Sequence, residues 1–510
     1  MPQQEISIIR SLLDPAIQLD TLEVNDLDTG TSPASTQTGT QDQIKDQQVH
    51  KDIGTNYPFI EINNYVFNTT EIETFEINYN GFIPTVRLVA GIKGKTFPSA
   101  AMPKDGDLMG VFIRAKNDVF KPIRNDYRIT GVRSAGADSD GRGGVYTITG
   151  ELFIPHLYDE VIVSYSGTSY EVLKQIAQEL KLGFASNDTA TNDSQTWINP
   201  GGDYYNYILD LADHAWKDEK SFFDVFIDVY YHLNFVNVNN QFSEGTEVDM
   251  ALLTNLQLTD SVGGEIAAKR MEDGAGTIAK VLSNHQDVKG TAAFVYHYNV
   301  KNNSNSISET YGYKTYTRFF EQNSEKYWSL FTDPLNTQGA AANKIILKGR
   351  TTKPGAPKEE FWKTQNRYIW GGIQYTIPEG NAHEKYSFAQ TWNERNLAEL
   401  QKMVLHIELE RGNFNIYRGE RIPIVLIIAS DNQYQNVMST PETDNKSAAF
   451  PQPIVDKFYS GYYMVSGMTF TYKAAGVSSF EDTEGNETPP SAPGFMHTMT
   501  LTRREWPTPV

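Results

Sequence analysis

Residues 94–96 read Gly-Lys-Thr, the sequence that closes a phosphate-binding loop in many nucleotide-binding proteins. Such a loop also needs a glycine five positions before Gly94, and this chain has Val89 there. The loop must open directly into a helix, which Phe97 and Pro98 do not favour. We therefore expect a turn between two strands and no nucleotide site.

A second motif, from Asp138 to Gly141, has the acidic residues and the glycine of a calcium-binding loop. When Gly141 takes the place of the required glycine, Gly136 falls on the first ligand position and Thr147 on that of the bidentate glutamate. Neither residue supplies a carboxylate. The stretch Ala137–Gly144 is therefore expected to be a plain hairpin loop.

The other candidates for catalysis or metal binding are isolated. His383 and Glu384 lack a second histidine four residues later, and no Gly-x-Ser-x-Gly sequence indicates a serine hydrolase. A glycosidase pair of carboxylates cannot be located, because such pairs have no fixed spacing along the chain. We predict no catalytic, cofactor-binding or metal-binding residue, no cofactor and no enzyme activity. Single histidines in amphipathic segments are more often structural than ligands, and these are His156, His214, His232, His297 and His406.

Two aromatic clusters could contact partners, but their helical spacing favours packing in a core. They are Tyr204, Tyr205 and Tyr207, and Phe222, Phe223 and Phe226.

The composition of the chain excludes several classes of protein. The chain has 510 residues, enough for several domains, and a net charge of −19, which argues against gripping nucleic acid as its main activity. It contains no cysteine, which excludes disulfides and thiolate metal sites. No apolar run is long enough to span a membrane, and the first residues lack the pattern of a signal peptide. We expect a soluble, β-rich protein assembled in the cytoplasm, with a surface used for partners.

Residues 59–165 consist of short segments with period-two alternation, separated by Gly, Pro and Asn or Asp, which predicts antiparallel β structure. A helical module of about 75 residues follows. Thr168 to Glu171 forms a capping box, and Gly183 stands where the first helix should stop. We predict a second helix from Asp203 and a third from Ser221, followed by a strand.

The polar stretch 26–56 has few large aliphatic residues and is expected to be a disordered insertion or an interaction arm. Residues 251–395 contain a predicted strand near 294–300 and a helix from His383 to Lys402. After that helix the β pattern returns, over 404–409, 422–428, 462–465 and 495–502.

The two β regions share one order of elements. In the first, Gly106 and Asp107 open a strand, a short strand ending in Gly-Val follows, and a long alternating strand comes after a Gly-rich loop. In the second, Gly419 and Glu420 open the same series. We interpret this as two copies of one small β-barrel. The alternative is that the shared order has no special meaning, because turns and strands alternate in any antiparallel domain. All four residues are predicted turn positions, and Gly106 is expected to need a positive φ.

The repeat and several short segments resemble the central baseplate hub proteins of contractile-tailed bacteriophages. The segments are Ser-Tyr-Glu-Val-Leu at 169–173, Arg-Gly-Glu-Arg-Ile-Pro-Ile-Val at 418–425, Gly-Tyr-Tyr-Met-Val at 461–465 and Leu-Thr-Arg-Arg-Glu-Trp at 501–506. The family includes the T-even phage hub and late-control hub proteins and is related to the N-terminal part of injection-system spike proteins. The resemblance covers residues 56–240 and 380–506, and the arm at 26–56 and the insertion around 300–380 have no counterpart.

The resemblance implies a fold that is mainly β with α+β insertions: two tube-type antiparallel β-barrel domains per chain plus a small helical module. It implies a homotrimer whose six barrels form a pseudo-sixfold ring between the sixfold tail tube and the trimeric central spike, with possible contacts to a tube-initiator, tape measure or wedge protein. The ring would line a conduit that DNA crosses without specific binding, in a virion tail baseplate. The expected divisions are 1–55, 56–165, 166–245, 246–380 and 381–510.

Two other functions remain open at this stage. The chain could be the hub part of a bacterial contractile injection system, which neighbouring genes for sheath and tube without a capsid would favour. It could instead be a tail-associated cell-wall or polysaccharide hydrolase, which needs a carboxylate pair in a cleft. Trp506, just before Pro507, is expected to anchor the packing near the C-terminus.

Overall fold

The structure is a computed structural model, and it describes the following parts of the chain: residues 58–93, 97, 101–113, 122–137, 143–243, 281–284, 291–303, 314–321, 326–332, 364–370, 383, 385–401, 403–409, 412–428, 454–456, 459–473 and 494–503. No helix among these residues is long and apolar enough to cross a membrane. They form two compact units. The first contains the described parts of Met1–Phe75, Val86–Phe153 and Tyr472–Phe495, and the second contains those of Glu76–Thr85, Ile154–Thr471 and Met496–Val510.

The first unit is built on strands in the order β3-β4-β7-β6-β5-β1-β2, although the last residues of β3, from Glu76, are counted with the second unit. Strand β5 shows why these segments are strands: its side chains alternate between partly exposed and buried, so one face forms a core. The hairpin predicted around 137–144 is confirmed, because Ala137 pairs with Gly144 in the antiparallel β6–β7 ladder. The bounds are β1 (Phe59–Ile62), β2 (Tyr65–Val66), β3 (Ile72–Asn78), β4 (Thr85–Lys93), β5 (Leu108–Ile113), β6 (Ile123–Ala137) and β7 (Gly143–Leu152).

The second unit contains six strands that close on themselves through their pairing. Their order is β19-β13-β14-β18-β23-β22, and β19 also pairs with β22. Strand β13 runs parallel to both of its neighbours, which corrects the prediction of a purely antiparallel barrel. The bounds are β13 (Val281–Ser283), β14 (Thr291–Asn302), β18 (Met403–Leu409), β19 (Arg421–Val425), β22 (Gly461–Lys473) and β23 (Gly494–Thr502).

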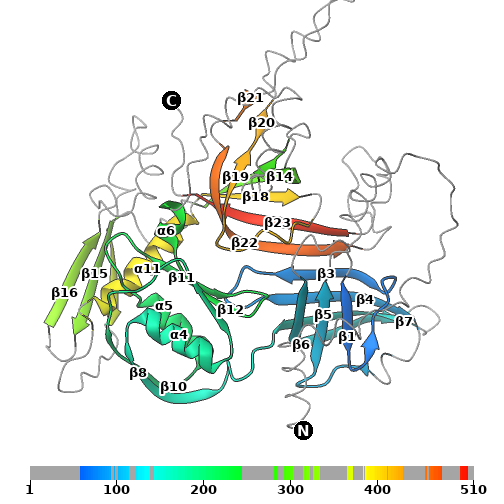
Figure 1. Ribbon diagram of the computed structural model, residues 1–510, viewed down its shortest axis with the longest axis horizontal. Helices are drawn as coiled ribbons and strands as arrows, with labels where there is room; N and C mark the ends of the chain where they lie inside the picture. Colours follow the sequence, from blue (N-terminus) through cyan, green and yellow to red (C-terminus); the bar gives the residue numbers. More distant parts are fainter. Residues whose placement is uncertain are drawn as a thin grey trace, which may run out of the picture. The chain divides into compact units, whose positions relative to one another are not determined.

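An α+β module and smaller sheets complete the second unit, and α4 and α5 contact each other and the ribbon of β8 and β10 (Figure 1). The chain is therefore mainly β, as predicted. The module has β8 (Glu160–Gly167), α4 (Ser169–Glu179), β9 (Gly183–Ser186), β10 (Gln195–Asp203), α5 (Tyr204–Asp213), β11 (Phe223–Ile227), β12 (His232–Asn237) and α6 (Val238–Ser243). Further elements are β15 (Lys314–Glu321), β16 (Lys326–Thr332), β17 (Thr364–Trp370), α11 (Tyr386–Leu400), β20 (Ile427–Ile428) and β21 (Ile454–Val455).

Helix α4 begins as predicted and ends differently. Thr168 and Glu171 form the full capping box, with both reciprocal hydrogen bonds. The left-handed residue that ends the helix is Lys181, with φ of +57°, and the N–H of Leu182 donates to the carbonyl oxygen of Ala177. Gly183, the predicted stop, is the first residue of β9. Its φ is outside the left-handed range, so its smallness serves close packing against His232.

The helix predicted from Ser221 is wrong, because this segment is strand β11. Phe223–Ile227 pairs antiparallel with β12, and the rings of Phe223 and Phe235 stack with centroids 4.7 Å apart. Apolar side chains at positions 222, 223 and 226 fit a helical stripe, but they also fit a strand that is buried on both faces. The pairing with β12 decides between the two. The helix predicted from Asp203 is confirmed, with Asp203 as its N-cap.

Helix α11 lies within the predicted span 383–402 and packs into the module. Trp392 and Ala389 share a buried cluster with Trp216 and Phe222 of the module and with Met464 of β22. The indole N–H of Trp392 donates to the carbonyl oxygen of Ser221 at 3.0 Å. The cluster therefore ties the helix, the module and the strand ring into one unit.

Candidate functional site

The first predicted turn is a tight turn with glycine in its third position. The N–H of Asp107 donates to the carbonyl oxygen of Lys104 at 3.0 Å, and Gly106 has φ of +87°. This geometry needs a residue that tolerates the left-handed region, which is the reason for glycine. The Oδ2 atom of Asp107 also accepts the N–H of Lys104 at 2.7 Å, and it accepts Nδ2 of Asn63 at the same distance. Gly106 and Asp107 are confirmed as turn residues.

The second predicted turn repeats this arrangement. The N–H of Glu420 donates to the carbonyl oxygen of Tyr417 at 3.2 Å, and Gly419 has φ of +81°. The Oε2 atom of Glu420 accepts the N–H of Tyr417 at 3.1 Å. In both turns the acidic residue after the glycine closes the turn twice, once through its backbone and once through its carboxylate.

The strands that follow the two turns pair in the same register. The carbonyl oxygen of Asp107 accepts the N–H of Ile129 at 3.2 Å, and that of Glu420 accepts the N–H of Val465 at 2.9 Å. Both ladders are antiparallel. The repeat seen in the sequence is therefore a structural repeat over the turn and the hairpin that it opens.

A buried tyrosine occupies the same position in both hairpins. Met109 pairs with Tyr127 in the first unit, and Ile422 pairs with Tyr463 in the second. Each pair comes two residues after the acidic turn residue, and both tyrosines are fully buried. Neither tyrosine stands out in the sequence, because each lies in a strand with several other large side chains. Aligning the two strands on their shared Gly131 and Gly467 would have matched them.

The two turns differ in what surrounds them. Arg418, in the second position of the second turn, stacks over the ring of Phe226 at 4.3 Å and pairs with Asp224 at 3.2 Å. Its guanidinium also donates to the carbonyl oxygens of Tyr79 and Gly81. Asp105 takes the corresponding place in the first turn and is exposed. The second turn is therefore fixed to the α+β module, whereas this side chain of the first turn faces solvent.

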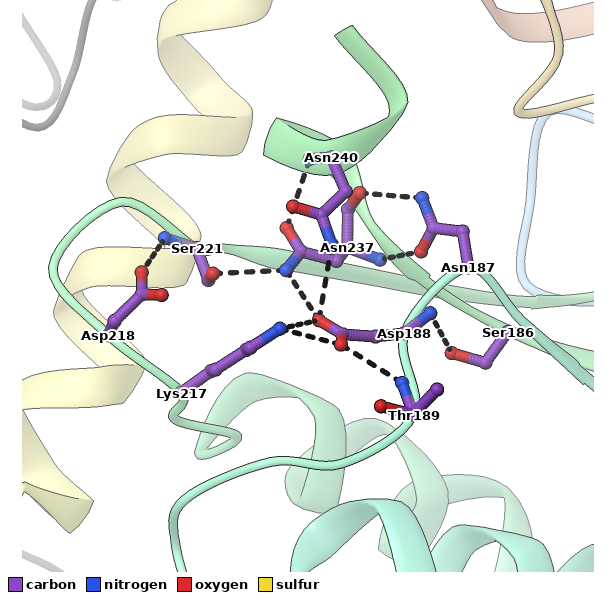
Figure 2. Close-up of polar contacts among 9 residues, drawn as sticks. All are labelled: Ser186, Asn187, Asp188, Thr189, Lys217, Asp218, Ser221, Asn237 and Asn240. Carbon is purple, nitrogen blue, oxygen red and sulfur yellow. Dashed lines mark hydrogen bonds and ion pairs between the residues drawn. The ribbon is translucent and has the colours of Figure 1, made fainter. Parts of the chain in front are cut away.

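A polar network holds the loop after β9 against the start of α6 (Figure 2). Its centre is Asp188, whose side chain is 5% exposed and lies 2.6 Å from Nζ of Lys217. The same carboxylate accepts Nδ2 of the fully buried Asn237 at 2.8 Å and Nδ2 of Asn240 at 3.3 Å, and the N–H of Thr189 at 3.0 Å. Such a buried charge is stable only when its lone pairs are all used.

The rest of the network ties three chain segments together. Asn187 bonds the backbone of Asn237 in both directions, through its Oδ1 at 2.8 Å and its Nδ2 at 2.9 Å. Nδ2 of Asn237 also donates to Oγ of Ser221 at 3.0 Å (Figure 2). Lys217 places an ammonium group where a bound cation could otherwise lie. We conclude that the network is structural and positions the module.

Several of the histidines named from sequence have side-chain or backbone partners. His214 lies 3.3 Å from Asp210 and stacks on Tyr386 with ring centroids 3.9 Å apart. His156 and His232 pair with the carboxylates of Asp159 and Asp228 at 2.7 and 3.3 Å. The backbone N–H of His383 donates to Oε1 of Gln195 at 2.9 Å. Among the described residues, no group of three or more acidic or histidine side chains is arranged to hold a metal.

The two aromatic clusters are mostly in the core, as predicted. Tyr204 and Tyr207 are buried in α5, and Phe222, Phe223 and Phe226 are buried in and beside β11. Tyr205 is partly exposed and stacks on the exposed Tyr158, with ring centroids 5.6 Å apart. This pair is the part of the clusters that solvent or a partner can reach.

Two carboxylates in the first unit lie on either side of Gly110. Glu61 of β1 and Asp126 of β6 both pair with Gly110 of β5, so they flank a residue with no side chain. Burial, with the nearby charge of Glu61, raises the pKa of Asp126 to about 6. Sequence alone could not locate this pair, because three strands bring it together.

Several predicted positions lie outside the described residues. These are the arm at 26–56, the Asp138–Gly141 motif, the Gly-Lys-Thr sequence at 94–96 and Trp506. Gly91 to Lys93, just before Gly-Lys-Thr, belong to strand β4.

Comparison with solved structures finds matches that include two tail proteins. The tail protein from Neisseria meningitidis MC58 is 8% identical, with a TM-score of 0.46 over 88% of this chain and 96% of that chain. The 43 kDa tail protein of prophage MuSo2 from Shewanella oneidensis is 8% identical, with a TM-score of 0.45 over 89% of this chain and 100% of that one. The Francisella PdpA-VgrG complex is 9% identical, with a TM-score of 0.39 over 91% of this chain and 61% of that one.

No family model matches the sequence, and a search of curated proteins finds no match.

Proposed function

We propose that this chain is a structural hub of a contractile phage tail baseplate. Three copies form a ring that joins the sixfold tail tube to the trimeric central spike and lines the conduit for DNA. The proposal contains no catalytic step and no cofactor. Its location is the virion tail baseplate, assembled in the host cytoplasm.

The observation that carries the proposal is the structural repeat of the two turns and hairpins. A chain with two equivalent β units offers two similar surfaces, so three chains in a closed ring offer six. The units are not identical, because Arg418 fixes the second turn and Asp105 leaves the first one exposed. In a ring of three such chains, the six similar β units give approximate sixfold symmetry, and the differences between the two units of each chain leave exact threefold symmetry. This combination suits an adapter between a sixfold and a threefold partner.

We extend the proposal to the domain arrangement. Residues 56–165 and 381–510 each form one tube-type barrel, with β13 and β14 from the connecting region 246–380 completing the second. In this proposal residues 166–245, with strand β8 just before them, form the α+β module that follows the first barrel in the sequence. The closed ring of six strands supports the second barrel.

The charge of the chain fits a conduit that DNA crosses without binding. Each chain carries −19, so three chains carry −57. Carboxylates that line the channel would repel phosphates and keep the DNA mobile. We propose that part of this charge faces the channel, and a channel wall that is basic in the structure of the ring would contradict it.

Electron microscopy of the full chain, expressed with the spike protein encoded nearby in the same genome, tests the proposal. We expect rings of three chains in which six similar β domains surround a channel, with the spike at one end. Single chains that never form rings, with or without the spike, would contradict it.

A specific observation keeps the hydrolase alternative testable. The Glu61–Asp126 pair provides two carboxylates of which one has a pKa of about 6, as a general acid requires. The purified chain on a cell-wall zymogram should produce no clearing if the hub proposal is right. Clearing that disappears in Asp126→Asn would establish the enzyme instead.

A further inference from the structure

The second unit has an open cavity of about 330 Å³ that crosses four neighbouring strands of the ring. We call it the cross-strand groove. It lies over β14, β18, β23 and β22, which span about 14 Å at the usual distance between strands. Its lining consists of Asn80, His297, Asn299, His406, Ile407, Glu408, Met468, Thr469, Thr498, Met499 and Thr500.

The polar residues of the groove stand in two rows set by the strand register. In one row, Glu408 lies opposite His297 on one side and Thr498 on the other. In the other row, His406 lies opposite Asn299 and Thr500. Because residues directly across a ladder point to the same face, each row presents its side chains together.

Three of these side chains have no partner in the described part of the chain. His297, Asn299 and Glu408 form no hydrogen bond or ion pair to another described residue, although His297 and Glu408 are directly opposite. Other side chains of the groove are already engaged: Nδ1 of His406 lies 3.2 Å from Oγ1 of Thr500, and Oγ1 of Thr498 donates to the carbonyl oxygen of Thr469. The groove therefore keeps one carboxylate, one amide and one imidazole available.

The lining restricts the chemistry of a ligand. It contains no lysine or arginine, so phosphate or carboxylate groups would meet Glu408 without a compensating cation. It contains no Phe, Tyr or Trp, so the large rings on which sugars and nucleobases usually stack are missing from the lining. Glu408 is the one acidic lining residue, and the amide and hydroxyl oxygens of Asn80, Asn299 and Thr469 can accept further hydrogen bonds.

We propose that the cross-strand groove binds an organic cation, an alkylammonium or guanidinium group, with Glu408 as its counter-ion and Asn299 as a further acceptor. The same chemistry is found in a basic side chain of a partner protein and in a free polyamine. The groove lies wholly within the second unit, so the proposal does not depend on the trimer.

The charges around the groove agree with this assignment. His406 is half-buried, and burial together with the charge of Lys301 lowers its pKa, so its imidazole is neutral near pH 7 and does not repel a cation. Lys301 is exposed near the end of β14 and does not line the groove. Lys301 repels a cation placed at that end, so the favoured position lies beside Glu408, in the row farther from Lys301.

Titration calorimetry on the full chain tests the proposal with four probes: N-acetylarginine amide, spermidine, inorganic phosphate and tri-N-acetylglucosamine. We expect the two cations to bind and the other two to fail. Glu408→Gln should weaken cation binding at least tenfold, while Glu160→Gln, the same change on an exposed strand position of β8, should leave it unchanged. Circular dichroism confirms that both variants fold.

The two cations distinguish the sources. Tighter binding of the arginine derivative indicates a basic side chain of a partner, and tighter binding of spermidine indicates a polyamine. Absence of cation binding, equal binding by wild type and Glu408→Gln, or a preference for phosphate or the sugar would overturn the proposal.

Discussion

Asp107 and Glu420 occupy the same position in two equivalent turns. Each follows a glycine with positive φ, and each carboxylate accepts the N–H of the residue three positions earlier, at 2.7 Å for Asp107 and 3.1 Å for Glu420. The carbonyl oxygen of each residue also accepts a backbone N–H from the strand that carries the buried tyrosine. The donor is Ile129 for Asp107 and Val465 for Glu420. The internal repeat therefore includes the same hydrogen bonds in both turns, as well as the same order of residues in the sequence.

The two glycines should be sensitive to alanine to different extents. Gly106→Ala should lower the free energy of unfolding by about 1–2 kcal/mol, the cost of placing a Cβ in the left-handed region. Gly419→Ala should cost more, because its Cβ would also lie 3.3 Å from the ring of Phe226, whereas nothing lies near that of Gly106. Urea unfolding measures both. Gly81→Ala is the control, since its φ is not positive and it meets only one atom, at 3.6 Å, and a loss there as large as at Gly106 would contradict the account.

The carboxylates of the two turns should contribute independently to the free energy of unfolding. Asp107→Ala and Glu420→Ala each remove an acceptor of a backbone N–H, and each should cost about 1 kcal/mol of unfolding free energy. The double variant should show the sum, because the residues lie in different units. Asp105→Ala changes an exposed neighbour and should cost less than about 0.5 kcal/mol. Denaturant titrations of the four variants check this, and strong non-additivity would count against independent turns.

The buried charge of Asp188 should matter more than its ion pair with Lys217. Asp188→Ala leaves Lys217 and three N–H groups without their acceptor and should cost about 3–5 kcal/mol. Lys217→Met should cost about 1–2 kcal/mol, since Asp188 keeps its other donors. A double-mutant cycle should give a coupling of at least about 1 kcal/mol.

The control for that cycle is the exposed pair of His156 and Asp159, whose side chains are 70% and 60% exposed. Asp159→Asn should change stability by less than about 0.5 kcal/mol. If Asp188→Ala proved as mild as this control, the network would not hold the module together.

His497 should make the protein less stable in acid. It is fully buried, stacks on Phe470 at 4.0 Å, and neither ring nitrogen has a hydrogen-bond partner in the described part of the chain. Burial lowers its pKa to about 3. Between that value and the ordinary one the unfolded chain binds the extra proton, so the free energy of unfolding falls as pH falls, by up to about 1.4 kcal/mol per pH unit.

His497→Phe should flatten this part of the pH profile, measured by urea unfolding between pH 4 and pH 7. The exposed His156 provides a control substitution, His156→Gln, measured under the same conditions. A His497→Phe variant that keeps the slope of the wild type would show that another group is responsible.

Local patterns were sufficient for the turns and for two helices. The capping box at Thr168, the N-cap at Asp203 and the glycines at 106 and 419 act within a few residues, so their types and spacing determine the local structure. Strand β11 could not be predicted from local pattern, because its apolar residues have helical spacing. Its conformation is set by pairing with β12. The parallel pairing of β13 likewise depends on β19, far along the chain.

The candidate sites also differ in whether local sequence or long-range strand pairing creates them. Both acidic turn residues were found from sequence because each belongs to a short motif. The cross-strand groove collects residues from Asn80 to Thr500, and the Glu61–Asp126 pair meets only through Gly110 on the strand between them. Long-range register creates these sites, and a single sequence does not reveal it.

The mass of the full chain in solution, with and without its spike protein, tests the central claim most directly. The account predicts three times the 57.4 kDa of one chain, either alone or once the spike is added. A chain that stays monomeric under both conditions, at concentrations where the spike itself is trimeric, would contradict the assignment as a hub.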